Sequence, residues 1–167
     1  MNKPDIAIVD NQDSPIGSKS RTDIDVEDIY RVSALWLTDT ETNKVLIAQR
    51  KLTKKNDPGK WSTAAAGTVE VGETYEGNMA KEIAEELGIK SLELAKGPKQ
   101  FIEDARNKFF CQWFLASVNA SEIELILQED EVEAVQWVSE EWLKEDVNRH
   151  PQKYPLYLPA SLQILTK

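Results

Sequence analysis

Short runs of branched and aromatic residues recur along the chain, separated by polar segments that contain glycine, proline or asparagine. Runs of this length and composition are typical of β-strands. They predict strands over residues 30–37, 44–49, 108–118 and 132–138, with a weaker candidate at 123–127. Residues 5–9 and 16–19 flank a segment rich in turn-forming residues and predict an N-terminal hairpin.

Three other segments carry helix signals. Residues 75–87 have apolar positions at helical spacing and stop before Gly88, a common residue just past a helix end. Ser139 is a natural N-terminal cap for a second helix, and residues 159–165 predict a short last one. Strands and helices alternate without a repeat or a shift in composition. We therefore expect one α/β domain over residues 1–167, with residues 1–28 as an N-terminal hairpin or extension.

Length and charge narrow the function classes. A chain of 167 residues and 18.9 kDa predicts a single domain, monomeric or homodimeric. Its 20 basic and 29 acidic residues give a net charge of -9, which disfavours nucleic acid as a partner. A small phosphorylated ligand stays compatible, because a metal ion can invert the local charge.

Sequence features of localisation are few. The first ten residues lack a basic region followed by an apolar run, so we expect no secretory signal. The most apolar stretch, residues 109–118, is too short to span a membrane. The single cysteine, Cys111, permits no internal disulfide and fits a reducing compartment. We expect a cytoplasmic protein with no membrane partner, in which Cys111 is a core or half-buried thiol.

Residues 75–87 also concentrate acidic side chains. At about 100° per residue, the expected core side of this helix carries Ala80, Ile83, Ala84 and Leu87. The opposite side is expected to carry Glu82, Glu85 and Glu86. Like charges at this spacing destabilise a helix by about 0.2–0.5 kcal/mol per pair. Two interpretations follow: a solvated acidic face, or hard oxygen ligands for Mg²⁺ or Mn²⁺.

The residues around this helix favour the second interpretation. Gly67, Gly72 and Glu73 precede the helix, and Lys81 stands directly before Glu82. Residues 67–89 resemble the Nudix box: glycine, five residues, glutamate, seven residues, Arg-Glu, an apolar residue, any residue, Glu-Glu, any residue, glycine, apolar. Each fixed position matches except one, where Lys81 replaces arginine and so lacks its planar fork. A gapped pattern this long is specific.

The resemblance implies an α/β/α sandwich around a mixed β-sheet, with a loop-helix-loop metal site. It also implies hydrolysis of a diphosphate linkage in a nucleoside diphosphate derivative, with Mg²⁺ or Mn²⁺ as cofactor. Glu82 and Glu86 match the principal metal ligands, and Glu85 a further ligand or a carboxylate that activates water. The Gly67 carbonyl would complete the metal shell. Glu73 would brace the loop through Lys81.

The resemblance extends upstream of the box. Residues 50–61 resemble isopentenyl-diphosphate isomerases, a branch of the same superfamily. Within them, residues 52–61 are polar and contain Pro58 and Gly59, which predict a loop. Arg50 and Lys54 match positions that contact the substrate diphosphate in that branch. The alternative for both is a solvated surface charge, in which case Lys99, Arg106 and Lys108 become the candidates.

The same alignment argues against isomerase activity. The isomerase catalytic cysteine falls on Ala66, and its metal-binding histidine falls on Thr68. Alanine supplies no acid or base for protonating an alkene. The single histidine, His150, lies far along the chain and is expected at the surface or at a helix end.

Two further groups of residues have more than one interpretation. Residues 129–133 form a second acidic cluster, in which Glu131 is either an additional base or ligand, or part of a charged turn. The aromatic residues of the strand-like segments are expected in the core, although one could stack on a nucleobase. They are Trp36, Trp61, Phe109, Trp113 and Trp137.

Three functions remain. The sequence favours a metal-dependent hydrolase of a small phosphorylated substrate, most simply a nucleotide. A non-catalytic Nudix-like module that binds a nucleotide is the first alternative, and the intact Glu82, Glu85 and Glu86 argue against it. A prenyl diphosphate isomerase is the second, and Ala66 and Thr68 argue against it. None of the substrate markers considered occurs after Ile89, so the pattern leaves the substrate open.

Overall fold

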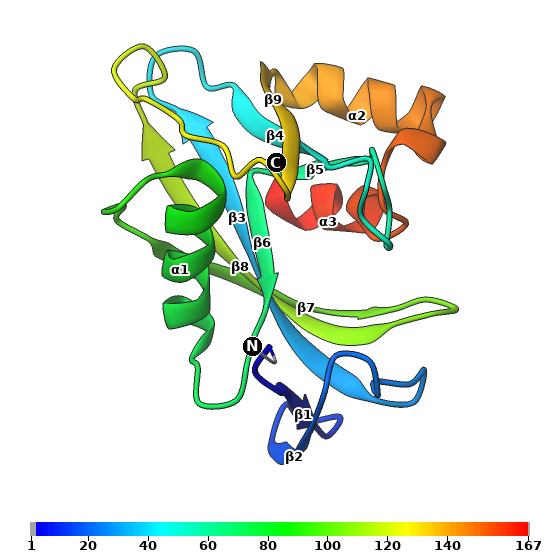
Figure 1. Cartoon of the computed structure of the whole chain (residues 1–167). Helices are drawn as coiled ribbons and strands as arrows, with labels where there is room; N and C mark the ends of the chain where they lie inside the picture. The colour runs from blue at the N-terminus through cyan, green and yellow to red at the C-terminus, as the bar shows by residue number, and fades with distance from the viewer. Residues whose placement is uncertain (1–2, 167) are drawn as a thin grey trace.

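The computed structural model describes residues 3–166, in which nine strands form one mixed sheet between layers of helices (Figure 1). The strands are β1 (Ile6–Val9), β2 (Pro15–Lys19), β3 (Ile29–Asp39), β4 (Val45–Arg50), β5 (Trp61–Thr63), β6 (Ala65–Thr68), β7 (Ala95–Glu103), β8 (Lys108–Val118) and β9 (Val132–Val138). The helices are α1 (Tyr75–Leu87), α2 (Glu140–Arg149) and α3 (Leu158–Leu165), with a 3₁₀ turn η1 at Pro151–Lys153.

Strand β3 organises the sheet. One of its edges pairs in parallel with β8 along all 11 residues of β3. The antiparallel partners β1, β6 and β4 follow one another along β3 in that order. Strand β8 continues to β7, and β4 pairs with both β5 and β9. The N-terminal hairpin and the strand that leads into α1 are therefore neighbours along β3.

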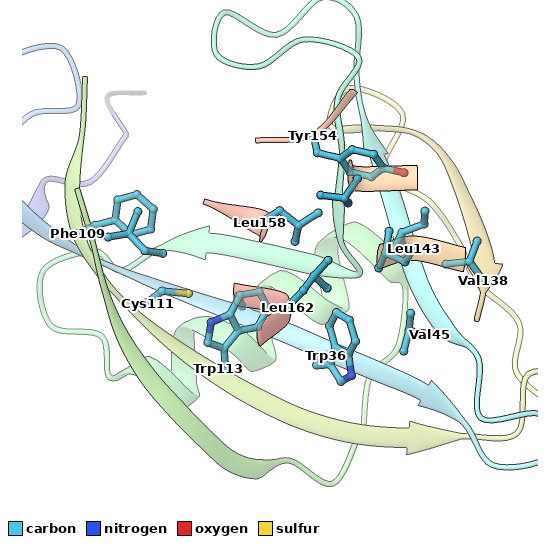
Figure 2. Close-up of a cluster of buried hydrophobic side chains, with 14 residues drawn as sticks. Trp36, Val45, Phe109, Cys111, Trp113, Val138, Leu143, Tyr154, Leu158 and Leu162 are labelled. Carbon is cyan, nitrogen blue, oxygen red and sulfur yellow. The ribbon is translucent and has the colours of Figure 1, made fainter. Parts of the chain in front are cut away.

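Alternation along β3 divides the core into two layers. Leu35 and Leu37 pack with Met79 and Ile83 of α1 on one face of the sheet. Trp36 lies in the cluster of the other face, which also contains residues of α2 and α3 (Figure 2). Helices therefore cover both faces of the sheet, which confirms the expected α/β/α sandwich.

Most predicted elements are confirmed. The hairpin, the four main strands and the three helices all occur near their predicted bounds, and α1 spans residues 75–87 as predicted. The strand predicted at 123–127 is wrong: this segment is irregular, and the Ile126 N–H donates to the Leu87 carbonyl at 3.0 Å. It completes the C-terminal end of α1 instead of joining the sheet.

Three strands have no counterpart in the prediction. Strands β5 and β6 are short, and β6 is Ala-Ala-Gly-Thr, whose small residues have low β-propensity. Strand β7 contains Gly97 and Pro98, and its register with β8 shifts between Lys96 and Lys99. Proline in a sheet is tolerated at such irregularities, where no ladder hydrogen bond is lost.

The turn of the N-terminal hairpin is tied to the domain by one carboxylate. Asp13 adopts a left-handed backbone conformation with φ of 63°, and its side chain is only 10% exposed. It lies 2.6 Å from Arg31 Nε and 2.5 Å from Lys99 Nζ, and it accepts a hydrogen bond from the Tyr75 hydroxyl at 3.0 Å. Because Tyr75 is the first residue of α1, the hairpin is linked directly to the start of this helix.

Asp13→Asn should lower the free energy of unfolding at pH 7 by about 1–3 kcal/mol, because two cations lose their carboxylate. Burial alone would raise the pKa of Asp13, but hydrogen bonds from Lys99, Arg31 and Tyr75 outweigh it and lower the pKa below the ordinary 3.8. The carboxylate therefore stabilises the fold above its unfolded pKa, and this contribution is lost as pH falls through the folded value. Urea unfolding should show that the difference in free energy of unfolding between wild type and variant becomes smaller below about pH 4. The control is Asp23→Asn, which changes an exposed aspartate. A difference in free energy of unfolding that does not depend on pH would contradict the proposed role of the Asp13 charge.

Candidate active site

Helix α1 and strand β6 approach each other closely at Gly67. A Cβ atom placed on Gly67 would lie 2.3 Å from Cδ of Glu82. Only glycine leaves room for the Glu82 carboxyl group to rest on the backbone of β6. The side chain of Glu82 is thereby held beside the Gly67 peptide.

Glu86 lies one helical turn further along the same side of α1. Its Oε2 is 3.4 Å from the backbone nitrogen of Ala66, which donates to it. Burial raises the pKa of Glu82 to about 7, and burial together with the neighbouring Glu82 charge raises the pKa of Glu86 to about 8. Two carboxylates are thus kept out of water side by side, an arrangement that a divalent cation would stabilise.

The structure corrects the expected sides of α1. Its buried residues are Asn78, Met79, Ile83 and Leu87, whereas Ala80 and Ala84 are exposed. Glu82 and Glu86 are half-buried beside this face, and only Glu85 is exposed to solvent. The prediction that all three glutamates lie opposite the core is therefore wrong. Glu82 and Glu86 lie on the side of α1 next to Ile83 and Leu87, and this side packs along β6.

The carboxylates near β6 form a pair rather than a larger cluster. Within residues 3–166, three or more Asp, Glu, His or Cys side chains do not gather into a group able to hold a metal ion. Glu82 and Glu86 form a pair, with the Gly67 peptide beside them. Mg²⁺ is commonly bound through one or two carboxylates, with waters and substrate phosphates completing its shell. A two-carboxylate site beside the Gly67 backbone fits this cation, and the exposed Glu85 is not needed for it.

The loop that leads into α1 is held by ion pairs. Lys81 Nζ lies 2.5 Å from Glu73 Oε1 and 3.1 Å from Glu70 Oε2. The other oxygen of Glu73 accepts hydrogen bonds from the Glu70 backbone and from Asn78 Nδ2, both at 2.9 Å. Hydrogen bonds from Lys81, from the Glu70 backbone and from Asn78 lower the pKa of Glu73, although burial opposes this shift. Glu73 therefore stays ionised and connects the loop to Lys81 of α1.

A cavity of about 240 Å³ adjoins the carboxylate pair. Ala66, Gly67, Thr68 and Glu86 line one wall, and Arg50 and Glu131 contribute from β4 and from the turn before β9. A volume of this size accommodates only a small ligand or part of a larger one. The cavity therefore brings four predicted site residues, Arg50, Gly67, Glu86 and Glu131, around one space.

Arg50 and Lys54 take different positions around this cavity. Arg50 lines it, and its Nε donates to the Asn56 carbonyl at 2.7 Å. Lys54 is not part of the lining; its Nζ lies 2.5 Å from Glu131 Oε1. The three alternative cations are also separated: Arg106 lines the cavity, Lys99 pairs with Asp13, and Lys108 pairs with Glu27.

Aromatic side chains form one wall of the cavity, and of these the sequence singled out only Phe109. The rings of Tyr30 and Phe109 stack with centroids 5.4 Å apart, and Tyr157 meets Phe109 edge-on. The hydroxyl of Tyr30 donates to Asn107, and that of Tyr157 lies 3.1 Å from Ser62 Oγ. With their polar ends occupied, these rings present apolar surface to a ligand. Tyr157 comes from the C-terminal region, and no local motif marks it.

Other residues noted in the sequence lie in or against the core or at a helix end, as expected. Cys111 is 2% exposed in the core, and burial raises the pKa of its thiol. His150 caps the C-terminal end of α2, and its side chain is 45% exposed. Trp36 and Trp113 are buried, and Trp61 and Trp137 are partly buried against the core clusters. In residues 3–166, every helix is too short or too polar to cross a membrane.

Comparisons with known proteins agree with the fold and the motif. A family model described as the NUDIX domain matches residues 29–157. An uncharacterised Nudix hydrolase of Pseudomonas aeruginosa is 32% identical over 160 residues, which cover 96% of this chain and 90% of that protein. An isopentenyl-diphosphate Delta-isomerase 2 of Photorhabdus laumondii is 27% identical over 156 residues, which cover 91% and 86%.

A solved structure shares the architecture almost end to end. The crystal structure of DR0079 from Deinococcus radiodurans superposes with a TM-score of 0.83 at 19% sequence identity. The match covers 98% of this chain and 99% of the other. At this identity the likeness establishes the fold, and it includes the N-terminal region that the family model leaves out.

Proposed function

The chain belongs to the Nudix family, and we propose that it hydrolyses a diphosphate linkage in a small phosphorylated substrate, most simply a nucleotide. One observation carries the proposal. Glu82 rests on Gly67 of β6, and Glu86 beside it lines a cavity that Gly67 and Arg50 also line. A carboxylate pair therefore lies at one wall of a space of ligand size that also contains a guanidinium, which is what a metal-bound diphosphate requires.

Nudix hydrolases generally use divalent metals, and the donor set here favours Mg²⁺ or Mn²⁺. Glu82, Glu86 and the Gly67 carbonyl are the groups that would hold such an ion. When bound, a divalent cation neutralises charge that develops on the phosphates and makes a bound water more acidic. The close approach at Gly67 keeps the Glu82 carboxyl group beside this backbone before any ligand enters.

The base that receives the proton of the attacking water is proposed to be Glu131. Its carboxylate lines the same cavity as Glu86 and is held at 2.5 Å by Lys54. Glu85, the other candidate, is exposed and does not line the cavity. The water oxygen would bond to phosphorus, its proton would pass to Glu131, and the anhydride oxygen would leave with the bond electrons.

Screening purified protein with Mg²⁺ against nucleoside diphosphate derivatives and isopentenyl diphosphate tests the proposal. Phosphate-containing products should form only with the cation present. Tight binding of a nucleotide without turnover would show a non-catalytic module instead. Conversion of isopentenyl diphosphate to its isomer would contradict the argument from Ala66 and Thr68, which line the cavity without supplying an acid like the isomerase cysteine.

Arg50→Ala should raise KM about tenfold or more while leaving metal affinity within twofold. A guanidinium–phosphate contact is charge-assisted, and its loss removes substrate binding rather than a metal ligand. Lys54→Ala should have a smaller effect on KM, because Lys54 binds Glu131 and does not line the cavity. Steady-state kinetics and Mn²⁺ titration measure both. The control is Lys51→Ala, which removes a neighbouring cation that pairs with Glu133. Equal kinetics for all three variants and wild type would show that Arg50 is a solvated charge.

A further inference from the structure

The N-terminal hairpin lies along the loop between β6 and α1, the two elements that carry the proposed metal site (Figure 1). The Val71 N–H donates to the Asp5 carbonyl at 2.9 Å, and the Ala7 N–H donates to the Val69 carbonyl at 3.4 Å. Ile6 pairs with Glu70 between these two contacts. Backbone pairing therefore fixes the path of this loop from the side of the hairpin.

Side chains extend this contact into a chain of alternating charge. Arg21, which follows β2, places Nη2 at 3.1 Å from Glu70 Oε1. The other oxygen of Glu70 lies 3.1 Å from Lys81, which also binds Glu73 at 2.5 Å. The charge chain thus consists of Arg21, Glu70, Lys81 and Glu73, and it runs from the hairpin to the loop and helix of the proposed site.

The position of Lys81 explains why a second cation is useful. Lysine offers one ammonium group, and here that single group is shared between Glu70 and Glu73. A guanidinium has five donors in a planar fork and can bind two carboxylates more completely. Arg21 supplies donors to the Glu70 oxygen that Lys81 does not reach. Two cations from different segments therefore bind Glu70. They are Lys81 of α1 and Arg21, which lies 49 residues before Glu70 in the chain.

We propose that Arg21 is a positioning residue for the metal site, acting through Glu70 and Lys81. Lys81 directly precedes Glu82 in α1, and Glu82 rests on Gly67. Fixing Lys81 and the loop therefore fixes the backbone that connects Gly67 to Glu82, two of the proposed metal-binding residues. The inference rests on the proposed function, because it concerns the affinity of that same site for its cation.

Arg21→Ala tests this directly, with Lys19→Ala as a matched control. The side chains of Arg21 and Lys19 are 38% and 37% exposed, and both form ion pairs of the hairpin region. Lys19 pairs with Asp25 and Asp28, away from the loop. Arg21→Ala should weaken Mn²⁺ binding, measured by electron paramagnetic resonance, about two- to fivefold, the range for one partly exposed pair. Lys19→Ala should leave it unchanged.

A rescue separates positioning from a general loss of stability. In the Arg21→Ala background, Lys81→Arg should return Mn²⁺ affinity to within twofold of wild type, because the fork can bind Glu70 and Glu73 together. Arg21→Lys should retain most of the affinity. At saturating cation, KM for the substrate should be unchanged in Arg21→Ala, since no substrate contact is lost.

The outcomes distinguish this inference from the proposed function. If wild type fails to bind Mn²⁺ and to hydrolyse any diphosphate, the proposed function fails. If wild type binds the ion but Arg21→Ala matches Lys19→Ala, or Lys81→Arg restores nothing, Arg21 is a surface charge and the inference is overturned. Thermal unfolding without metal should change alike in Arg21→Ala and Lys19→Ala, so that a difference in Mn²⁺ affinity reflects the site.

Discussion

Replacing Glu86 with glutamine is expected to lower kcat by about 100- to 1,000-fold in the presence of Mg²⁺. The variant keeps the shape of the side chain and its contact with the Ala66 N–H, but it removes one charge from the carboxylate pair. Losing one electrostatic partner of a phosphoryl-transfer site costs a factor of this size. Steady-state rates over a range of Mg²⁺ concentration measure it, and near wild-type turnover would falsify the assignment of the site.

The metal-free stability of this variant should move in the opposite direction. Burial and the neighbouring Glu82 charge both disfavour an ionised Glu86, so the amide should leave the free energy of unfolding unchanged or higher. Mg²⁺ should raise the Tm of wild type and have little effect on the variant. Glu76→Gln, an exposed change on the same helix, is the control and should behave like wild type throughout.

Gly67→Ala is expected to reduce metal affinity and kcat about 100-fold without unfolding the protein. The added methyl group would overlap Cγ and Cδ of Glu82, and this flexible side chain can rotate away more easily than the backbone of β6 can move. The cost then falls on the position of the carboxylate rather than on the fold. Mn²⁺ titration and steady-state kinetics measure the loss, and thermal unfolding checks that the fold survives.

Gly17→Ala provides the matched control for this substitution. A Cβ atom on Gly17 meets no atom within 4 Å, and the residue lies in the exposed strand β2. It should change neither metal affinity nor rate. If Gly67→Ala behaves in the same way, then Glu82 either is not a metal ligand or reaches the ion from another rotamer.

Local sequence signals predicted those parts of the molecule that local contacts determine. Helix α1 has its predicted bounds because Thr74 caps one end and Gly88, with φ of 71°, closes the other. The box also located Gly67, Glu73, Glu82 and Glu86 in one region, as the resemblance implied. The side of α1 on which Glu82 and Glu86 lie was predicted wrongly, because it depends on the packing of α1 against β6. That strand was not predicted, since its small residues have low β-propensity.

The rest of the site depends on contacts between distant segments. Glu131 is brought to the cavity from the turn before β9, and Tyr157 from just before α3. Arg21 reaches Glu70 only because β1 pairs with both β3 and the loop after β6. The acidic cluster at residues 129–133 marked Glu131 as a candidate, but period and composition do not encode which strands become neighbours, so Tyr157 and Arg21 could not be found from pattern alone.

The parallel pairing of β3 with β8 has a consequence for the order in which the site can form. Partners such as Thr38 and Ser117 lie 79 residues apart, so the central pair of the sheet closes a long loop of chain. Contacts of such separation form slowly, after their entropy of closure has been overcome. Residues 67–89 are contiguous and are synthesised before β8. Their strand β6 pairs with β3, and β3 in turn pairs with β8 along its whole length. The box should therefore acquire its metal-binding geometry only after the ribosome has passed residue 118, and a nascent chain that ends at Gly88 should be unable to hold the cation.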